Sequence, residues 1–226
     1  MKKAILAFIL VLFFANTGFA ASVIYKEGNV KIMRKGETFW ISANPQAVVS
    51  EGDKVKTFNN SSCEIAFDKE KRNVLRVEED TEITIDRFGQ TKISMEKGKV
   101  LSRIKNLEQG STFEIRTPTA VAGAAGTGWG VDCDGRKTTI LVFENDIYIL
   151  NPNAPSERRI VTQGNKTTME RSQRVGVVEF VVLTRIENDR WGRWVEELEE
   201  RLEEKGRMDR IREIDKRFNE RYGTTE

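Results

Sequence analysis

The stretch TPTAVAGAAGTGWGVDCDG, residues 117–135, decides which fold the sequence predicts. It is rich in glycine and alanine, and it has the period of neither an amphipathic helix nor an ordinary strand. Three kinds of structure need so many small residues: a phosphate-binding loop, a catalytic turn, or a crossing where two segments of backbone pack closely. The rest of the sequence distinguishes among them.

The glycine spacing and the absence of histidine exclude the first two kinds of structure. A phosphate loop requires Gly-x-x-x-x-Gly-Lys-Ser/Thr, and a dinucleotide fingerprint requires Gly-x-Gly-x-x-Gly before a helix. Gly126, Gly128 and Gly130 fit neither spacing, and the chain has no histidine to serve a nucleophile elbow. We therefore expect a close-packed crossing. The alternative is an exposed surface that receives a partner strand or a glycan, with Trp129 as its anchor.

Short alternating runs surround this stretch and predict strands. The clearest runs are Val30–Ile32, Cys63–Phe67, Thr81–Ile85, Lys92–Met95 and Phe113–Ile115. Turn residues separate the runs, so strands recur about every ten to fifteen residues. We predict an all-β domain over residues 21–183, with a sandwich-like or solenoid-like arrangement of strands.

The first twenty residues have the pattern of a secretory signal peptide. Two lysines precede an apolar run from Ala4 to Ala15, and Gly18 and Ala20 fit the small-residue positions of a cleavage site. The alternative, an uncleaved membrane anchor, needs about 20 apolar residues. We expect cleavage after Ala20, a periplasmic or otherwise extracytoplasmic mature protein, and no stable membrane span after cleavage.

Composition excludes several classes of function. The formal net charge is +2, and it falls to zero when Lys2 and Lys3 leave with the signal peptide, so we expect no nucleic-acid partner. The absence of histidine removes the commonest general base and metal ligand. With two cysteines and no histidine, no Cys/His zinc site can form. We expect no metal and no cofactor.

Residues 184–226 form a charged segment with two apolar stripes at helical spacing. The first stripe consists of Trp191, Trp194, Leu198 and Leu202, and the second of Ile211, Ile214 and Phe218. The nine residues from Leu202 to Ile211 make about two and a half turns, so the stripes face opposite ways. Because Gly206 lies between them, we predict two short helices, or one helix with a break there.

The two stripes have different expected partners. We expect the stripe that begins at Trp191 to pack on the β domain, because it follows the last strand directly. The stripe that begins at Ile211 is expected to mediate self-association or to bind a second protein, since an isolated helix of this length gains little stability from propensity alone.

The turn and strand markers also occur in a familiar order. The series comprises Glu27–Ile32, Glu51–Thr57, Cys63–Phe67, Glu96–Val100, Phe113–Ala120 and Gly126–Thr127. Over about residues 24–170 the chain resembles the FecR domain family. The resemblance implies a FecR-type β domain and structural roles for six motif residues. These residues are Gly52, Asp53, Thr117, Pro118, Gly126 and Thr127.

The chain departs from the family at three points. Ala125-Gly126-Thr127 stands where the family usually has Arg-Gly-Thr, and Glu144-Asn145-Asp146 stands where a glutamate-glycine turn is usual. Asn and Asp tolerate the left-handed conformation that glycine would supply, so we expect this hairpin to persist. The best-known members carry a cytoplasmic anti-sigma segment before a membrane span. Since two lysines alone precede the apolar run, we expect only the exported module here.

The positions of the two cysteines predict that both side chains lie in the core of the β domain. Cys63 shares a strand face with Ile65 and Phe67, and Cys133 shares one with Trp129 and Val131, so both sulfurs should point inward. We predict a Cys63–Cys133 disulfide, which an extracytoplasmic location permits. The alternative is two separate buried thiols.

Two classes of function remain. The first is a non-catalytic binding or scaffold module of the cell envelope, with protein or glycan partners. The second is an exported carbohydrate-active hydrolase, because paired carboxylates suffice to cleave glycosides. The carboxylates available for it are Asp132, Asp134, Glu78, Glu79 and Asp80. Since these residues also have ordinary turn composition, we favour the binding module over an enzyme.

Overall fold

The structure is a computed structural model that describes residues 21–88, 90–105, 107, 110–124, 126–170 and 179–222. The proposed signal peptide, residues 1–20, lies outside the described residues. Within the described part, the chain forms strands followed by one long helix, α1 (Arg185–Tyr222). The prediction of an all-β domain followed by a helical segment is confirmed.

The strands, in chain order, are β1 (Ala21–Glu27), β2 (Val30–Met33), β3 (Ile41–Ser42), β4 (Val48–Val49), β5 (Lys54–Thr57), β6 (Ser62–Ala66), β7 (Asn73–Val77), β8 (Glu82–Arg87), β9 (Thr91–Ile104), β10 (Phe113–Arg116), β11 (Val121–Ala124), β12 (Thr127–Cys133), β13 (Lys137–Glu144), β14 (Ile147–Asn151), β15 (Ala154–Val161), β16 (Asn165–Glu170) and β17 (Val181–Val182).

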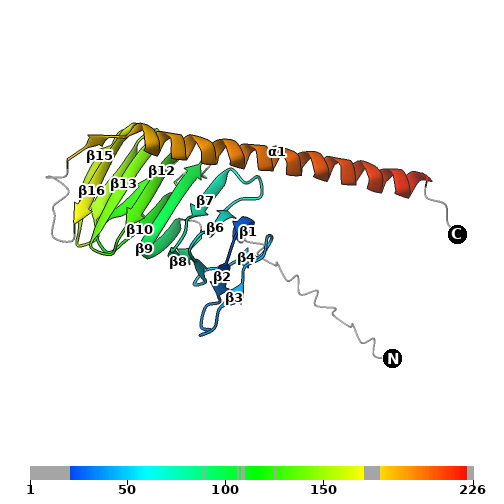
Figure 1. The fold of residues 1–226 in the computed structure, drawn as a ribbon, viewed down its shortest axis with the longest axis horizontal. Helices are drawn as coiled ribbons and strands as arrows, with labels where there is room; N and C mark the ends of the chain where they lie inside the picture. The colour runs from blue at the N-terminus through cyan, green and yellow to red at the C-terminus, as the bar shows by residue number, and fades with distance from the viewer. Residues whose placement is uncertain are drawn as a thin grey trace, which may run out of the picture.

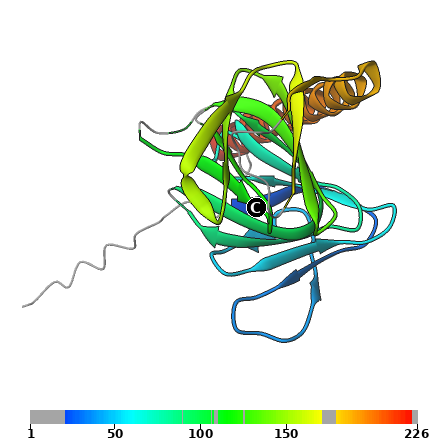
Figure 2. The ribbon, with the colours of Figure 1, turned by 90° about the vertical axis from the view of Figure 1, so that its left-hand side faces the viewer.

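The strands form two layers that are joined through β9 (Figures 1 and 2). The first layer has the order β4-β1-β6-β7-β9-β12-β13-β16-β17, and the second has the order β3-β2-β5-β8-β9-β10-β11-β14-β15. Gly98 lies where β9 passes from one layer to the other. Its φ of +132° and the Thr81 side chain beside it leave no room for a larger residue. The arrangement is therefore a sandwich rather than a solenoid.

The main core lies between the layers. Side chains alternate along each strand, so Val100 points into the core while Leu101 points to the outside of the first layer. Both layers contribute large buried side chains to the core, among them Ile65, Leu75, Ile83, Ile93, Phe113 and Trp129. Trp129 is fully buried and makes an edge-to-face contact with Phe113 at 5.8 Å between ring centroids. The alternative of Trp129 as an exposed anchor for a ligand is therefore wrong.

The predicted close packing in residues 117–135 occurs at glycines other than Gly126. A Cβ on Gly123 would lie 2.5 Å from the Tyr148 ring, and one on Gly128 would lie 2.7 Å from Cη2 of Trp191. A Cβ added to Gly126 would have the Ile104 carbonyl oxygen as its nearest described neighbour, at 4.0 Å, so there is space for a side chain. Gly126 is needed instead for its φ of +113°.

The predicted break at Gly206 is wrong, because α1 is continuous from Arg185 to Tyr222. One glycine costs a helix interior about 1 kcal/mol, which neighbouring interactions can offset. Beyond Gly206, ion pairs one turn apart link Arg212 to Asp209, Lys216 to Glu220 and Arg217 to Glu213. Since the helix is continuous, its two apolar stripes do face opposite ways.

The predicted disulfide is also absent, since both cysteines are free and buried. The prediction that both side chains point into the core is correct. However, Cys63 lies on β6 and Cys133 on β12, and β7 and β9 lie between them in the first layer. Three strand spacings of about 4.8 Å give roughly 14 Å, whereas a disulfide needs Cα atoms within about 7 Å.

Candidate functional site

The family-motif residues at 52 and 53 hold a turn between strands. Gly52 has a φ of +86°. Asp53 is almost fully buried, and its carboxylate accepts hydrogen bonds from the backbone N–H groups of Lys35 and Ser50, both at 3.0 Å. The Arg34 guanidinium also binds it, at 2.6 Å. These contacts fix backbone and leave the carboxylate no free oxygen for chemistry.

The motif threonines have a similar surrounding. The Thr117 hydroxyl accepts from the Ala120 N–H at 3.0 Å and lies 2.7 Å from the Thr138 hydroxyl, which in turn lies 2.6 Å from that of Thr119. Pro118 lies within this turn, half-buried. The Thr127 hydroxyl donates to the Glu144 carbonyl. All of these contacts tie one strand or turn to the next.

The first half of α1 packs on the outer face of the first layer. Trp191, Trp194 and Leu198 are buried there, with Leu202 and Val195 half-buried beside them. The Trp191 ring stacks on that of Phe143, with centroids 4.7 Å apart and an angle of 5° between planes. The Trp191 indole also lies directly against Gly128, where any side chain would clash with the ring. This stripe therefore packs on the β domain.

A buried carboxylate lies under the same half of α1. Glu64 on β6 is fully buried, accepts a hydrogen bond from Nε1 of Trp194 at 2.9 Å, and pairs with Arg201 of the helix and with Arg76 of β7. Burial raises the pKa of the Glu64 carboxyl, and Arg201 and Trp194 oppose this shift. The strand period placed Glu64 on the outer face, but nothing in the sequence indicated that a helix residue 137 positions away would cover it.

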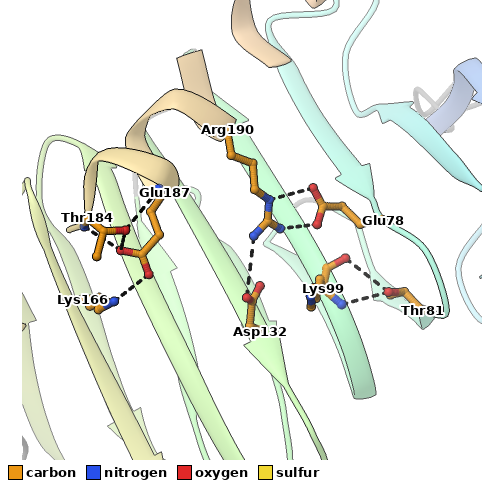
Figure 3. A network of polar contacts seen from close by, with 8 residues as sticks. All are labelled: Glu78, Thr81, Lys99, Asp132, Lys166, Thr184, Glu187 and Arg190. Atoms are coloured by element: carbon orange, nitrogen blue, oxygen red, sulfur yellow. Dashed lines mark hydrogen bonds and ion pairs between the residues drawn. The ribbon is translucent and has the colours of Figure 1, made fainter. Parts of the chain in front are cut away.

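The N-terminus of α1 carries a capping box. The Glu187 carboxylate accepts from the Thr184 N–H at 2.7 Å, while the Thr184 hydroxyl accepts from the Glu187 N–H at 3.3 Å (Figure 3). Lys166 of β16 also pairs with Glu187, at 2.6 Å. Although partial burial opposes it, hydrogen bonds from Lys166 and Thr184 lower the pKa of Glu187. The start of the helix is thus fixed to β16.

Two of the candidate catalytic carboxylates meet at one arginine of α1. The Arg190 guanidinium binds both oxygens of Glu78, with Nε at 3.1 Å from Oε1, and its Nη1 lies 3.7 Å from Asp132 (Figure 3). Burial raises the pKa of Asp132, and the positive charge of Arg190 opposes this. Asp132 lines a hollow of about 320 Å³ together with Glu79, Asp80 and Asp134.

The remaining carboxylates hold turns. Asp134 accepts from the backbone N–H groups of Lys137 and Arg136 at 2.9 and 2.8 Å, and these bonds lower its pKa. Glu79 accepts from the Asn60 N–H at 3.1 Å. Among the described residues, no group of His, Cys, Asp and Glu side chains is arranged to hold a metal ion.

The second half of α1 extends beyond the β domain (Figure 1). The twenty residues after Leu202 span about 30 Å at 1.5 Å per residue. Its exposed apolar side chains are Met208, Ile211 and Ile214, at 50%, 44% and 65% exposure. Phe218 belongs to the helix, but its side chain lies outside what the structure describes. We call residues 203–222 the projecting segment.

Residues 53–148 match the family model described as FecR protein. The predicted resemblance to the FecR domain family is confirmed over these residues. The match lies within the 24–170 range of the ordered markers and includes the motif residues from Asp53 to Thr127. It covers β5 to the first two residues of β14, so the helix α1 lies outside it.

The solved structures similar to the chain include two crystal structures, at 1.65 and 2.50 Å resolution, of a candidate anti-sigma factor from Parabacteroides distasonis. Each has a TM-score of 0.47 and 10% sequence identity, over 57% of this chain. The chain matches 59% of the length of that protein. No curated protein matches the chain.

Proposed function

We propose that this protein is an exported, non-catalytic FecR-domain module of the bacterial cell envelope. In this proposal, the β domain is a platform, and the projecting segment of α1 contacts a second protein or a second copy of the chain. A glycan contact by the β domain belongs to the same proposal. The proposal depends mainly on the exposed apolar stripe of the projecting segment, which interacts with the β domain at Lys71 through Lys205 and Asp209 and then extends beyond it.

The low stability of an isolated helix favours a partner that covers this exposed apolar stripe. An isolated helix of about 20 residues is marginal in water, because propensity alone contributes little and an amphipathic face must be covered. On the face turned toward the β domain, Asp209, Arg212 and Lys216 make the segment soluble through ion pairs one turn apart. The apolar stripe on the opposite face has no such role, so we assign it to a partner.

The charged residues beside the apolar stripe indicate which charges that partner would carry. Arg207 and Arg210 are exposed and make no ion pair with a described residue. Asp215, on the other side of the stripe, is also exposed and makes no ion pair with a described residue. A partner helix with its own apolar stripe and flanking charges of both signs would cover Ile211 and Ile214 and pair with these groups.

The test is a pair of variants with equal change in charge. Ile211→Glu with Ile214→Glu lowers the charge by two on the apolar stripe, and Lys216→Glu lowers it by two on the opposite face. A photoreactive residue at position 208 should cross-link to a partner or to a second copy in cells. We expect the double variant to abolish the cross-link and the Lys216 variant to retain it; equal cross-linking in all three proteins would refute the proposal.

Export is the second part of the proposal. The signal-like residues 1–20 support it, and a cut after Ala20 would leave β1 complete, because Ala21 is buried and paired with Val49. Among the described residues, no helix is long and apolar enough to cross a membrane. Mass spectrometry of the periplasmic fraction should find a chain beginning at Ala21; a chain that retains Met1 in the membrane fraction would contradict export.

The absence of catalysis is the third part. Glycoside cleavage requires two carboxyl groups free to flank the scissile bond. Here Glu78 and Asp132 share the Arg190 guanidinium, while Asp134 and Glu79 accept backbone hydrogen bonds in turns. Hydrolysis of envelope glycans that is lost in Asp132→Asn, with the fold intact by circular dichroism, would contradict this part.

A further inference from the structure

The apolar stripe of the projecting segment has the spacing of a coiled-coil seam. Ile211 and Ile214 are 44% and 65% exposed and lie three residues apart, as the a and d positions of a two-stranded coiled coil do. With Ile211 at a, Arg210 directly before it takes the g position. Asp215, directly after Ile214, takes the e position. The seam therefore has a positive group on one flank and a negative group on the other.

These two flanking charges lack a partner within the described part of the chain. Arg210 and Asp215 are both exposed, and neither makes an ion pair with a described residue. On the face turned toward the β domain, by contrast, Arg212 pairs with Asp209 one turn away. The segment thus offers one charge of each sign to whatever covers the stripe.

A second copy of the same segment supplies the complementary charges. In a parallel two-stranded coiled coil, each g residue lies near the e residue five positions later on the other helix. Arg210 and Asp215 are five positions apart. A parallel pair in register would therefore place Arg210 of each helix beside Asp215 of the other, which gives two equivalent ion pairs along a seam of isoleucines.

The antiparallel orientation lacks this complementarity. With Ile211 of one helix against Ile214 of the other, an antiparallel pair brings g residues beside g residues. Arg210 would then lie beside Arg217, which takes the next g position and has the same charge. Juxtaposed like charges oppose association. The charges therefore favour the parallel orientation.

The place of the β domain on α1 permits a parallel pair. Trp191, Trp194 and Leu198 pack on the sheet, and the exposed stripe lies on the opposite face of the same continuous helix. Two helices joined along this stripe would carry their β domains on the outer sides of the pair. Because paired helix axes lie about 8–10 Å apart, both helices would separate the two domains.

The pairing is confined to the projecting segment. Nearer the β domain, the same face of α1 carries the exposed side chains of Glu200, Glu204 and Arg207. In a parallel pair, each of these would meet the same charge on the other copy. The helices would therefore diverge toward the β domains and pair from Met208 onward, over about two heptads. So short a contact makes a dimer that depends strongly on protein concentration.

From this charge pattern we infer that the partner of the projecting segment is a second copy of this chain, joined to it as a parallel two-stranded coiled coil. This pairing rests on the protein contact of the proposed function and names its partner, orientation and register. It would hold two β domains side by side at the same end of the helix pair.

The test is self-association of the purified full chain, measured by sedimentation velocity over a series of concentrations at low ionic strength, where exposed charges are least screened. Arg210→Glu would bring two acidic groups together at each flank, and Asp215→Arg would bring two arginines together. We expect either change to weaken self-association about tenfold, which is about 1.4 kcal/mol. The matched control is Lys216→Glu, which changes the charge as Arg210→Glu does but on the opposite face, and it should associate as the wild type does.

Mixing the two charge variants tests the orientation. In a mixed parallel pair, the introduced glutamate lies beside the introduced arginine, and Arg210 of one copy lies beside Asp215 of the other, so both contacts are attractive. We expect the equimolar mixture to associate as tightly as the wild type. An antiparallel pair would instead be strengthened by Arg210→Glu alone, because the new glutamate would lie beside Arg217. That result, or no gain on mixing, would overturn the parallel pair.

The cross-link at position 208 separates this pairing from the wider proposal. A product of twice the chain mass that is weakened in Arg210→Glu would support both. A cross-link to a different protein, with a purified wild type that remains monomeric at every concentration, would overturn the second copy as the partner and leave the protein contact standing. No cross-link to any protein would refute both. Circular dichroism of each variant establishes that the helix compared is intact.

Discussion

Replacing Gly128 with alanine should loosen the attachment of α1 to the β domain. The new Cβ would lie 2.7 Å from Cη2 of Trp191 and closer still to Cζ2, and 3.1 Å from Cγ of Glu144. The indole cannot move away easily, because its other neighbours are the stacked Phe143 ring and the Trp194 ring at 5.1 Å. Overpacking of this kind costs about 1–3 kcal/mol.

For a domain of 150–250 residues, each kcal/mol lowers the melting temperature by about 2–4 °C, so the expected loss is about 2–12 °C. The assay is thermal unfolding followed by near-ultraviolet circular dichroism, which reports the packing of Trp191 and Trp194. The matched control is Gly192→Ala, since nothing lies within 4 Å of its Cβ position on the outer face of the helix. That change should stabilise the helix by about 0.8–1 kcal/mol. If Gly128→Ala melts at or above the wild-type temperature, the docking of α1 described above is incorrect.

Three further predictions concern the core and its turns. Burial raises the pKa of Cys63 to about 12, so iodoacetamide should leave it unmodified in the folded protein and label it together with Cys133 in urea; a Cys63–Cys133 linked peptide would contradict their separation by two strands. Because burial raises the pKa of Glu64, the folded chain keeps this proton to higher pH than the unfolded chain does, and the free energy of unfolding should fall as the pH rises from the unfolded value of 4.5 through the folded pKa. Urea unfolding between pH 4.5 and 8 should show a shallower fall in Glu64→Gln, and an equal slope in both proteins would refute this. Gly126→Ala and Gly126→Val should both cost about 1–2 kcal/mol, because the strain comes from the backbone angle; a much larger loss for valine in the same unfolding measurement would indicate close packing instead.

Local sequence patterns predicted the elements of the β domain well. The alternation of Cys63, Ile65 and Phe67 correctly gave the inward face of β6, because side chains on a strand alternate whatever the strand pairs with. The left-handed residue expected in the Glu144–Asp146 turn is Asn145, with a φ of +51°. Both inferences depend on neighbours within a few residues.

The errors arose where distant segments decide the structure. The disulfide prediction failed because β7 and β9 lie between the strands of Cys63 and Cys133. The alternation within each strand shows which face a cysteine occupies, but it does not show which strands pair. Gly206 resembles a helix break in isolation, but α1 continues past it, and ion pairs one turn apart stabilise the turns that follow. Similarly, Glu64 and Trp194 look unrelated in sequence, and they meet only because α1 returns across the first layer.

Because α1 is continuous, its attached half and its projecting half move together as one rigid rod. The attached half is held on the sheet by Trp191, Trp194 and Leu198. The projecting segment extends about 30 Å past Leu202. A tilt of about 5° at the sheet would displace the tip by about 2.6 Å over that length. A helix broken at Gly206 would absorb such a rotation at the break. Torque applied at the tip is therefore carried by all the contacts that hold α1 on the sheet, from the Arg201–Glu64 ion pair to the Trp191 contact with β12 and β13. The stiffness of these contacts sets how far the tip can move.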